Sequence, residues 1–402
     1  MYYFFQPKVL PFLLDFTIFV LPFYCIIIII IIIIRIRMRS LFLNLLLFTS
    51  FAASAQLLQP GFDRSEYLET LRVNQRVFVN TEKWDTIADV PEPQHYRLEY
   101  RAPEVALDNR WDLWMHTEKP QAMIAIRGTV RTEVSFMANL YAAMIPASGH
   151  IQLEDDWMFE YKLAQHPQAA VQVGWFIGMA YMSGPIIDKI DSCYQRGVRD
   201  FILTGHSQGG AICFMLTAYL ENLRLDGKLP ADIRFKSYCS AGPKPGNLYF
   251  AYDYEHLTRG GWAFNVVNPL DWVPDVPFSI QTVYDLTHVN PFKEVDKVLR
   301  KQKLPQKIAF KIAYNELSRP AKRAQRNYER FLGDMVERVV KKQLPGLATP
   351  DYVSTNYYVR TGPTVVLYPG ADYYQKFNES DSTTNVWYHH GIDAYHYLAE
   401  KY

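Results

Sequence analysis

The segment that most constrains the fold is the pentapeptide GHSQG at residues 205–209, which has the pattern Gly-x-Ser-x-Gly. It follows the apolar run Phe201–Thr204, which predicts a strand, and it overlaps the start of Ser207–Leu223, which predicts a helix. A turn this tight strains the backbone of the serine, and small residues on both sides avoid a clash. The Ser207 hydroxyl is then exposed at the carboxyl end of the sheet. This strand–turn–helix setting therefore predicts the nucleophile turn of an α/β domain; the alternative is an ordinary glycine-rich turn.

Strand and helix patterns alternate along the rest of the chain. Further strands are predicted at Ala122–Ile126, Phe235–Ser240, Ala263–Val267 and Thr364–Leu367. Helices are predicted at Asp63–Val77 and, at the end, about Gly391–Lys401. This alternation predicts a mostly parallel central sheet flanked by helices. Hydrophobic residues make up 49% of the 402 positions, enough for a sizeable core, and a net charge of +1 argues against a nucleic-acid partner.

A basic segment interrupts this alternation. Residues 293–342 carry fifteen Lys or Arg and six Asp or Glu, with helical periodicity and few β-branched runs. We predict a helical insertion at about residues 291–345, before the C-terminal strand and helix. Lys and Arg on an amphipathic helix favour anionic membrane surfaces, so the insertion could contact a membrane. The alternative is a solvated charged surface with no partner.

The N-terminus predicts targeting. The first hydrophobic stretch, residues 10–34, ends in nine isoleucines, and a second covers Leu41–Phe48. Counted from Met38, Arg39, the second stretch and the triplet ASA at residues 53–55 form a signal peptide in the usual order. We predict a signal peptide at 38–55, an upstream extension or mis-assigned start at 1–37, and an exported body at 56–402. A membrane anchor is the alternative, because the first stretch can span a bilayer.

The four cysteines do not predict a metal site. Cys25, Cys193, Cys213 and Cys239 show no Cys-x-x-Cys spacing and have no accompanying histidine cluster. Cys213 lies in an apolar helical run and is expected to be a small buried side chain. The spacing leaves a disulfide among the last three open.

A serine nucleophile needs a base, and the base needs an orienting acid. With Gly-x-Ser-x-Gly these follow in the order serine, acid, histidine. Asp271 is the predicted acid, because it follows the strand Ala263–Val267 in a loop stiffened by prolines, which can hold a carboxylate in place. Asp275, four residues later, is the alternative.

His390, just before the C-terminal helix, is the predicted base. His389 is the main alternative. His396 would lie within the helix and His288 in a loop before the insertion. His206 is expected to pack beside the turn, because adjacent residues on a sharp turn point apart.

The oxyanion that forms in acyl transfer needs two donors. One is expected to be the backbone N–H of Gln208, the residue after the nucleophile. The other is expected from the loop after Ala122–Ile126, where Gly128 permits a close approach and Thr129 can offer its N–H and hydroxyl.

Four blocks and the C-terminus together resemble the class 3 lipase family, the fungal-type triacylglycerol lipases and their plant and bacterial relatives. The blocks are IAIRGT (124–129), TGHSQGGA (204–211), AGPKPGN (241–247) and NPLDWVPDVP (268–277), joined by His390 with Tyr395 five residues later. Three departures stand out: Gln208 replaces the usual Leu, the block at 171–176 lacks a His often found there, and the span from acid to base is long.

The resemblance implies an α/β-hydrolase fold and a serine ester hydrolase that acts on acylglycerol or other lipid esters. It implies Ser207, Asp271 and His390 as the triad and Thr129 and Gln208 at the oxyanion hole. No metal and no organic cofactor is needed for this chemistry. The resemblance also implies a lid, and the apolar segment Glu133–Ala147 could form it or could be a core helix.

Two other functions fit the same residues. The first is other acyl chemistry on the same triad, such as peptide cleavage or acyl transfer, because fold does not settle the reaction. The second is a non-catalytic surface protein with a decayed hydrolase body. The sequence leaves acyl and head-group preference and the oligomeric state open.

Overall fold

The computed structural model describes residues 34–35, 37–39, 58–78, 89–300, 302–377 and 385–402. The chain divides into two compact units, Met1–Gln56 and Leu57–Tyr402. The second unit contains the sheets and hydrophobic clusters described below and so has a core of its own, the property of a domain that can fold alone. The predicted signal peptide at 38–55 lies outside the described residues except for Met38 and Arg39, as does most of the extension at 1–37.

A seven-stranded sheet forms the centre of this unit. Its strands are, in spatial order, β1 (Tyr96–Arg101), β2 (Trp111–His116), β3 (Gln121–Ile126), β8 (Asp200–His206), β9 (Arg234–Ser240), β11 (Ala263–Val267) and β13 (Thr364–Val366). The five strands from β3 to β13 run parallel, and β1 and β2 form an antiparallel edge. The mostly parallel sheet that the sequence predicts is therefore confirmed.

Alternate residues of the inner strands point to opposite faces of the sheet, and both faces are buried. In β3, Ile124 belongs to one hydrophobic cluster and Met123 to the other. In β8, Phe201 and Ile202 divide in the same way. A strand covered on both sides has a continuous apolar sequence, which explains the apolar run that precedes the Gly-x-Ser-x-Gly pentapeptide.

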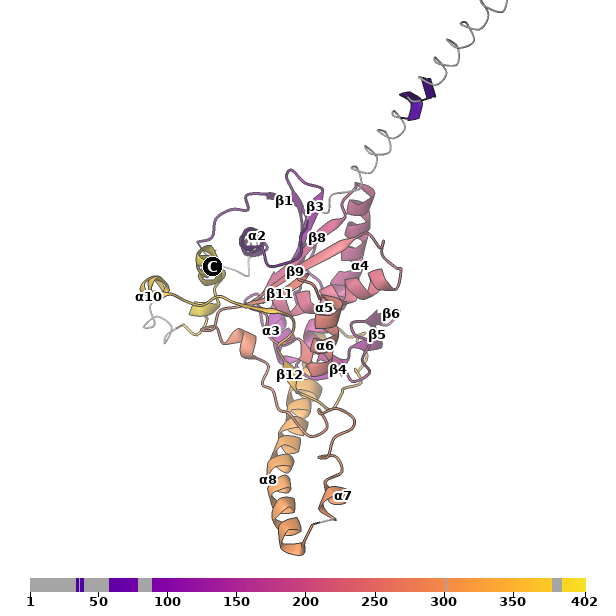
Figure 1. The fold of residues 1–402 in the computed structure, drawn as a ribbon, viewed down its shortest axis with the longest axis vertical. Coiled ribbons are helices and arrows are strands. Elements are labelled where there is room, and N and C mark those ends of the chain that lie inside the picture. Colours follow the sequence, from indigo (N-terminus) through magenta and orange to yellow (C-terminus); the bar gives the residue numbers. More distant parts are fainter. Residues whose placement is uncertain (1–33, 36, 40–57, 79–88, 301, 378–384) are drawn as a thin grey trace, which may run out of the picture. The chain divides into compact units, whose positions relative to one another are not determined.

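Helices cover both faces of the sheet (Figure 1). One face is covered by α2 (Arg64–Arg76) and α12 (Ile392–Lys401), and the other by α4 (Val173–Gln195), α5 (Gln208–Leu225) and α6 (Leu248–Leu257). Asp63 caps α2, since its side chain accepts hydrogen bonds from the backbone N–H groups of Ser65 and Glu66.

Smaller elements surround this core. A four-stranded sheet contains β12 (Tyr358–Val359), β10 (Gly246–Asn247), β7 (Ala170–Gln172) and β4 (Met144–Pro146), and a hairpin contains β5 (Ser148–Glu154) and β6 (Trp157–Lys162). Outside the basic insertion, α3 (Glu133–Leu140) and α10 (Ala371–Lys376) are short helices, and 3₁₀ turns lie at Val273–Asp275 and Tyr388–His390.

The basic insertion is helical. It consists of α7 (Val295–Leu299), α8 (Leu304–Glu329), a π-helical turn at Arg330–Asp334, and α9 (Met335–Gln343). The last two pack on the body: Val340 is fully buried in the core, and the Leu332 carbonyl accepts hydrogen bonds from Ala142 N and Ala143 N. We call residues 289–326, which include α7 and most of α8, the arm; it extends away from the body (Figure 1).

Two further features bear on the sequence predictions. Only the first half of Glu133–Ala147 is helical; Tyr141 is buried, and Met144 starts β4. Cys193, Cys213 and Cys239 are buried free thiols, so no disulfide joins them. Among the described helices, none combines the length and the apolar character needed to cross a membrane.

Candidate active site

Ser207 occupies the turn between β8 and α5. Its φ of 62° and ψ of −129° lie in a region that L-residues rarely adopt. The turn is fixed on both sides: Ser207 N donates to the Ser240 carbonyl of β9 at 3.0 Å, and Gly210 N donates to the Ser207 carbonyl at 2.8 Å. Ser207 is partly exposed in a stretch whose neighbours are buried. A strained and partly exposed serine at the start of a helix is what the pentapeptide predicts.

Glycines are needed here because backbone segments approach closely. A Cβ on Gly205 would collide with the Gly209 carbonyl, so the turn cannot close with a larger residue. A Cβ on Gly128 would lie 2.8 Å from the His206 carbonyl oxygen and 3.5 Å from Ser207 Cβ. The loop after β3, which carries Thr129, therefore lies against the serine turn, where a second oxyanion donor would have to be.

Asp271 and His390 meet although 119 positions separate them. His390 Nδ1 lies 2.7 Å from Asp271 Oδ2, and both residues are buried. Asp271 follows β11, and His390 ends the 3₁₀ turn before α12. An Nδ1–H that donates to the carboxylate leaves the Nε2 lone pair of the imidazole to accept a proton.

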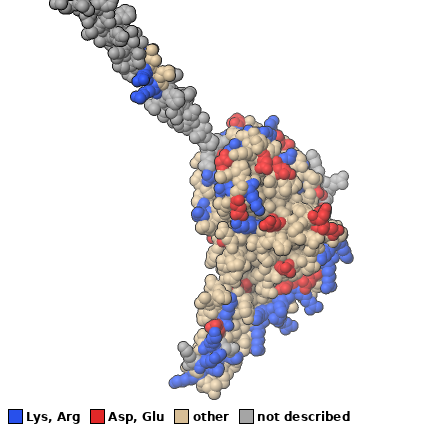
Figure 2. Space-filling view, turned by 90° about the vertical axis from the view of Figure 1, so that its right-hand side faces the viewer, with Lys and Arg blue, Asp and Glu red and all other residues tan. Residues whose placement is uncertain are grey.

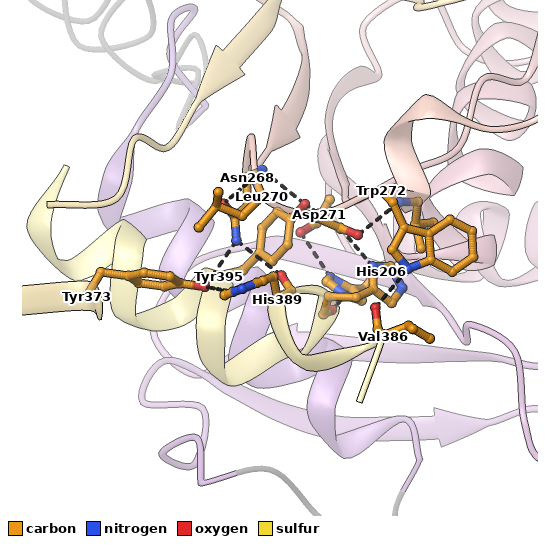
Figure 3. A network of polar contacts seen from close by, with 12 residues as sticks. His206, Asn268, Leu270, Asp271, Trp272, Tyr373, Val386, His389 and Tyr395 are labelled. Carbon is orange, nitrogen blue, oxygen red and sulfur yellow. Dashed lines mark hydrogen bonds and ion pairs between the residues drawn. The ribbon is translucent and has the colours of Figure 1, made fainter. Parts of the chain in front are cut away.

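The Asp271 carboxylate is held by two further donors. Tyr395 of α12 donates its hydroxyl to Oδ2 at 2.8 Å, and Val273 N donates to Oδ1 at 2.9 Å. The Tyr395 hydroxyl in turn accepts from Asn268 N at 3.0 Å. Burial, together with the Asp271 charge, raises the pKa of Tyr395, so it stays a proton donor. Figure 3 shows Tyr395 and Asn268 beside Asp271. The sequence marked Tyr395 only as part of the C-terminal block, and its contact with the acid was not foreseen.

His206 joins the serine turn to the segment that carries the base. Its Nε2 lies 2.8 Å from the His390 carbonyl oxygen, its Nδ1 lies 3.1 Å from Ser240 Oγ, and the His206 and His390 ring centroids are 5.0 Å apart. Burial, and secondarily the neighbouring His390, lowers the pKa of His206 to about 3. A neutral, enclosed imidazole fits the expected packing role.

The alternative residues lie elsewhere. His389 Nδ1 is 2.9 Å from the Tyr373 hydroxyl, on the side away from Trp272 in Figure 3. Asp275 pairs with Arg360 at 3.3 Å on the surface. His396 is buried in α12, and His288 is exposed in a loop. The structure thus pairs Asp271 with His390 and with none of these histidines.

A side-chain network orients the predicted oxyanion residues. Thr129 Oγ1 donates to Gln208 Oε1 at 3.0 Å and accepts from Asn139 Nδ2 at 3.0 Å. Gln208 Nε2 donates to Asn109 Oδ1 at 3.2 Å, and Asn139 Oδ1 accepts from Trp175 Nε1 at 2.9 Å. Gln208 is almost fully buried. Its side chain, which departs from the family pattern, thus has a polar role that sequence analysis missed.

Aromatic side chains border the histidine. Trp272 and Trp387 are 41% and 46% exposed, and their ring centroids are 4.8 Å apart. The Trp387 ring lies 5.7 Å from that of His390, and Trp272 Nε1 donates to the Val386 carbonyl at 2.8 Å (Figure 3). An exposed apolar surface therefore adjoins the histidine.

Among the residues that the structure describes, no group of three or more His, Cys, Asp or Glu is arranged to hold a metal ion.

The strand order and the serine turn between β8 and α5 define an α/β-hydrolase fold, as predicted. The acid follows β11 and the histidine follows β13, so the sheet presents them in the order that this fold uses. Residues 123–281 match the model of the family described as "Lipase (class 3)". The resemblance to class 3 lipases is thus confirmed over this part of the chain, and the match supports lipase-type ester hydrolysis.

Solved structures with partial similarity are also lipases by title. The Rhizomucor miehei lipase propeptide complex is 17% identical, with 55% of this chain and 65% of that chain covered and a TM-score of 0.37. Lip2 lipase from Yarrowia lipolytica is 18% identical, with 55% of this chain and 76% of that chain covered and a TM-score of 0.40. A triacylglycerol lipase from Penicillium expansum is 15% identical, with 54% of this chain and 75% of that chain covered and a TM-score of 0.38. The chain thus spans less than two thirds of the Rhizomucor miehei chain. A comparison with curated proteins gives no match.

Proposed function

We propose that the protein is a serine carboxylic ester hydrolase in which Ser207 is the nucleophile, His390 the base and Asp271 the orienting acid. The observation that carries the proposal is the 2.7 Å contact between His390 Nδ1 and the buried Asp271 carboxylate, next to a strained serine turn. Tyr395 and Val273 N hold that carboxylate from two more directions. A fixed carboxylate keeps the imidazole in the tautomer whose Nε2 can accept the serine proton.

The reaction proceeds in two acyl-transfer steps. Ser207 Oγ attacks the ester carbonyl carbon while its proton moves to His390 Nε2, and the tetrahedral intermediate then expels the alkoxide, which takes that proton and leaves as the alcohol. Water next attacks the acyl-enzyme and gives a proton to His390. Collapse releases the carboxylic acid and returns the proton to Ser207.

The oxyanion is stabilised by backbone N–H groups of Gln208 and Thr129. The Thr129 hydroxyl has one proton, and Gln208 Oε1 accepts it, so this hydroxyl is a positioning group. Asn139 supports the same oxygen from α3. The partial positive charge at the start of α5 adds to the stabilisation of the oxyanion.

The substrate is a lipid ester, such as an acylglycerol. Two observations favour an apolar acyl chain over a peptide: the exposed Trp272 and Trp387 beside the histidine, and the match of residues 123–281 to a lipase family. Phe136 and Leu140, 45% and 42% exposed on α3, extend this apolar character to the first half of the proposed lid. We further propose export of the body, on the basis of the signal-peptide pattern at residues 38–55.

Fluorophosphonate labelling of residues 57–402, with mass mapping of the adduct, tests the proposal. We expect the adduct on Ser207, and we expect Ser207→Ala to abolish both labelling and ester hydrolysis. A panel of p-nitrophenyl esters, triacylglycerols and peptides then separates ester hydrolysis from peptide cleavage. A folded protein that takes no label, or a Ser207→Ala variant with full activity, would refute the assignment and favour the non-catalytic alternative.

A further inference from the structure

The arm carries exposed large apolar side chains and clustered basic residues in the same segment. Most of its large apolar side chains face solvent: Leu304, Phe310 and Ile312 are 69%, 59% and 58% exposed, whereas Leu299 is buried. Val298, Ile308 and Leu317 are exposed as well. Bulky aliphatic and aromatic residues in this number are normally buried, and a contiguous exposed group of them marks an interaction surface.

These apolar residues do not share one face of α8. Successive residues of an α-helix are rotated by about 100°, so residues four apart, such as Ile308 and Ile312, lie on one face. Phe310 lies on roughly the opposite face, because it is rotated by about 200° from Ile308. A groove on a partner protein receives one face of a helix. A surface into which the end of the arm inserts can cover residues on several faces at once.

The arm is also basic. Lys293, Lys297, Arg300, Lys303 and Lys307 surround the junction of α7 and α8, from which the exposed apolar residues of α8 begin. Residues 293–342 hold 15 of the 42 Lys and Arg but only 6 of the 41 Asp and Glu, which leaves the remainder of the chain with an excess of acidic residues. Figure 2 shows blue and tan along the arm with little red. Two arms would repel each other, so contact between the arms of two copies is disfavoured.

The arm starts beside the candidate active site. α9, which continues from α8, packs against α3, and Leu332 accepts hydrogen bonds from Ala142 and Ala143 just after α3. α3 carries Asn139, the residue that supports Thr129. A partner surface bound by the arm would therefore lie on the side of the body that carries α3 (Figure 1).

We propose that the arm binds the molecule to an anionic lipid surface. Leu304, Ile308, Phe310 and Ile312 enter the interface, and the surrounding lysines contact phosphate head groups with their ammonium groups while their alkyl chains lie along the apolar layer. This inference deepens the proposed lipid-ester hydrolysis by naming the surface at which it occurs. It does not depend on the reaction, because binding is measurable in a Ser207→Ala background.

Vesicle co-sedimentation tests the charge requirement. Residues 57–402 with Ser207→Ala are mixed with phosphatidylcholine vesicles that either contain or lack phosphatidylglycerol. We expect binding to the anionic vesicles and much weaker binding to the neutral ones. Lys297→Glu, Lys303→Glu and Lys307→Glu together should lower the affinity about a hundredfold or more, because each basic residue near an anionic surface contributes roughly a factor of five. Arg97→Glu, Lys119→Glu and Lys228→Glu, which change the same charge on the body, should leave binding within about twofold of the parent.

A fluorescent label tests which part enters the lipid. Cys193, Cys213 and Cys239 are buried, so a cysteine at Phe310→Cys can be labelled selectively with an environment-sensitive dye. The matched control is Met158→Cys on β6, where the native side chain is 56% exposed. We expect the emission at position 310, and not at position 158, to shift to the blue on addition of anionic vesicles and to be quenched by lipid-borne quenchers.

Three results would overturn the proposal. The first is absence of binding by folded protein, and the second is binding that the body charge variant weakens as much as the arm variant does. The third is a blue shift at position 310 that depends on protein concentration without vesicles, which would assign the arm to contact between copies. Failure of fluorophosphonate labelling with intact vesicle binding would instead reject the proposed hydrolysis and leave the arm assignment standing.

Discussion

The body that carries the candidate active site and the arm are built in opposite ways. In the body, two side chains of the candidate site are each held by several groups: Asp271 by His390, Tyr395 and the Val273 N–H, and Thr129 by Gln208 and Asn139. On the arm, Phe310 and Leu317 are mostly exposed. A rigid, preorganised site suits a reaction that needs fixed geometry, whereas exposed apolar and basic residues suit an adaptable surface. This difference predicts that substitutions in the candidate site and substitutions on the arm have separate effects.

The sharpest test of this comparison lies in the two adjacent histidines. His390→Ala should lower kcat about 10³- to 10⁶-fold, because it removes the proton acceptor, whereas His389→Ala should lower it less than about tenfold. Ester hydrolysis by purified variants with matched circular dichroism measures the difference. If His389→Ala proves the more damaging change, the Asp271–His390 contact is not the catalytic one.

The same substitution, Phe to Ala, should change the free energy of unfolding by different amounts in the body and on the arm. Phe201→Ala removes a fully buried ring of β8 and should lower the free energy of unfolding by about 3–5 kcal/mol. Phe310→Ala on the arm, 59% exposed, should change it by no more than about 0.5 kcal/mol. Denaturant unfolding of residues 57–402 provides the measurement. A large loss for Phe310→Ala would mean that the arm is packed in solution, contrary to the comparison.

The buried His206 should make the body sensitive to acid. Its pKa is lowered to about 3 in the folded state, against an ordinary value of 6.5. Because the unfolded state binds the proton more readily, this group lowers stability as the pH falls below 6.5 towards 3, by about 2 kcal/mol from pH 7 to pH 5. His206→Asn should flatten that dependence in urea unfolding at several pH values. An unchanged slope would show that other groups cause the acid sensitivity.

A smaller effect separates positioning from catalysis within the site. Thr129→Val keeps the backbone N–H and the side-chain volume but loses the hydroxyl. If that hydroxyl only positions the loop, kcat should fall less than about tenfold, whereas loss of an oxyanion donor would cost about 10²- to 10³-fold. Steady-state hydrolysis of a soluble ester gives the answer, and Gln208→Leu serves as the matched change on the other side of the hydrogen bond.

Features that depend on neighbouring residues, such as strand limits and the serine turn, were predicted from the sequence. The strand limits of β11 were matched residue for residue, and the serine turn was recognised because a short motif enforces it. The pairing of Asp271 with His390 depended on choosing among histidines, and the family pattern, not a local signal, favoured that choice. The catalytic roles of these residues remain predictions.

Contacts between distant segments were beyond the sequence. Nothing near Tyr395 indicates that its hydroxyl reaches a carboxylate 124 positions earlier. Gln208 was recognised as a departure from the family pattern, but its partners Thr129 and Asn109 come from two other loops. The segment Glu133–Ala147 was predicted to be a lid or a core helix, but Met144–Pro146 in its second half pairs with β7. Such outcomes depend on tertiary packing, which periodicity does not record.

The contact between the two ends of the arm, where it leaves the body, allows the length of the arm to vary. Lys322 Nζ lies 2.9 Å from the Tyr284 hydroxyl, so the outgoing and returning chains meet where the arm leaves the body. The entropy of closing a loop grows only slowly with its length, so turns can be added to or removed from α8 with little effect on the body. The 26 residues of α8 extend about 39 Å, and each added turn would lengthen the helix by about 5.4 Å. If the arm binds a lipid surface as proposed, its length sets the distance between that surface and the candidate nucleophile Ser207.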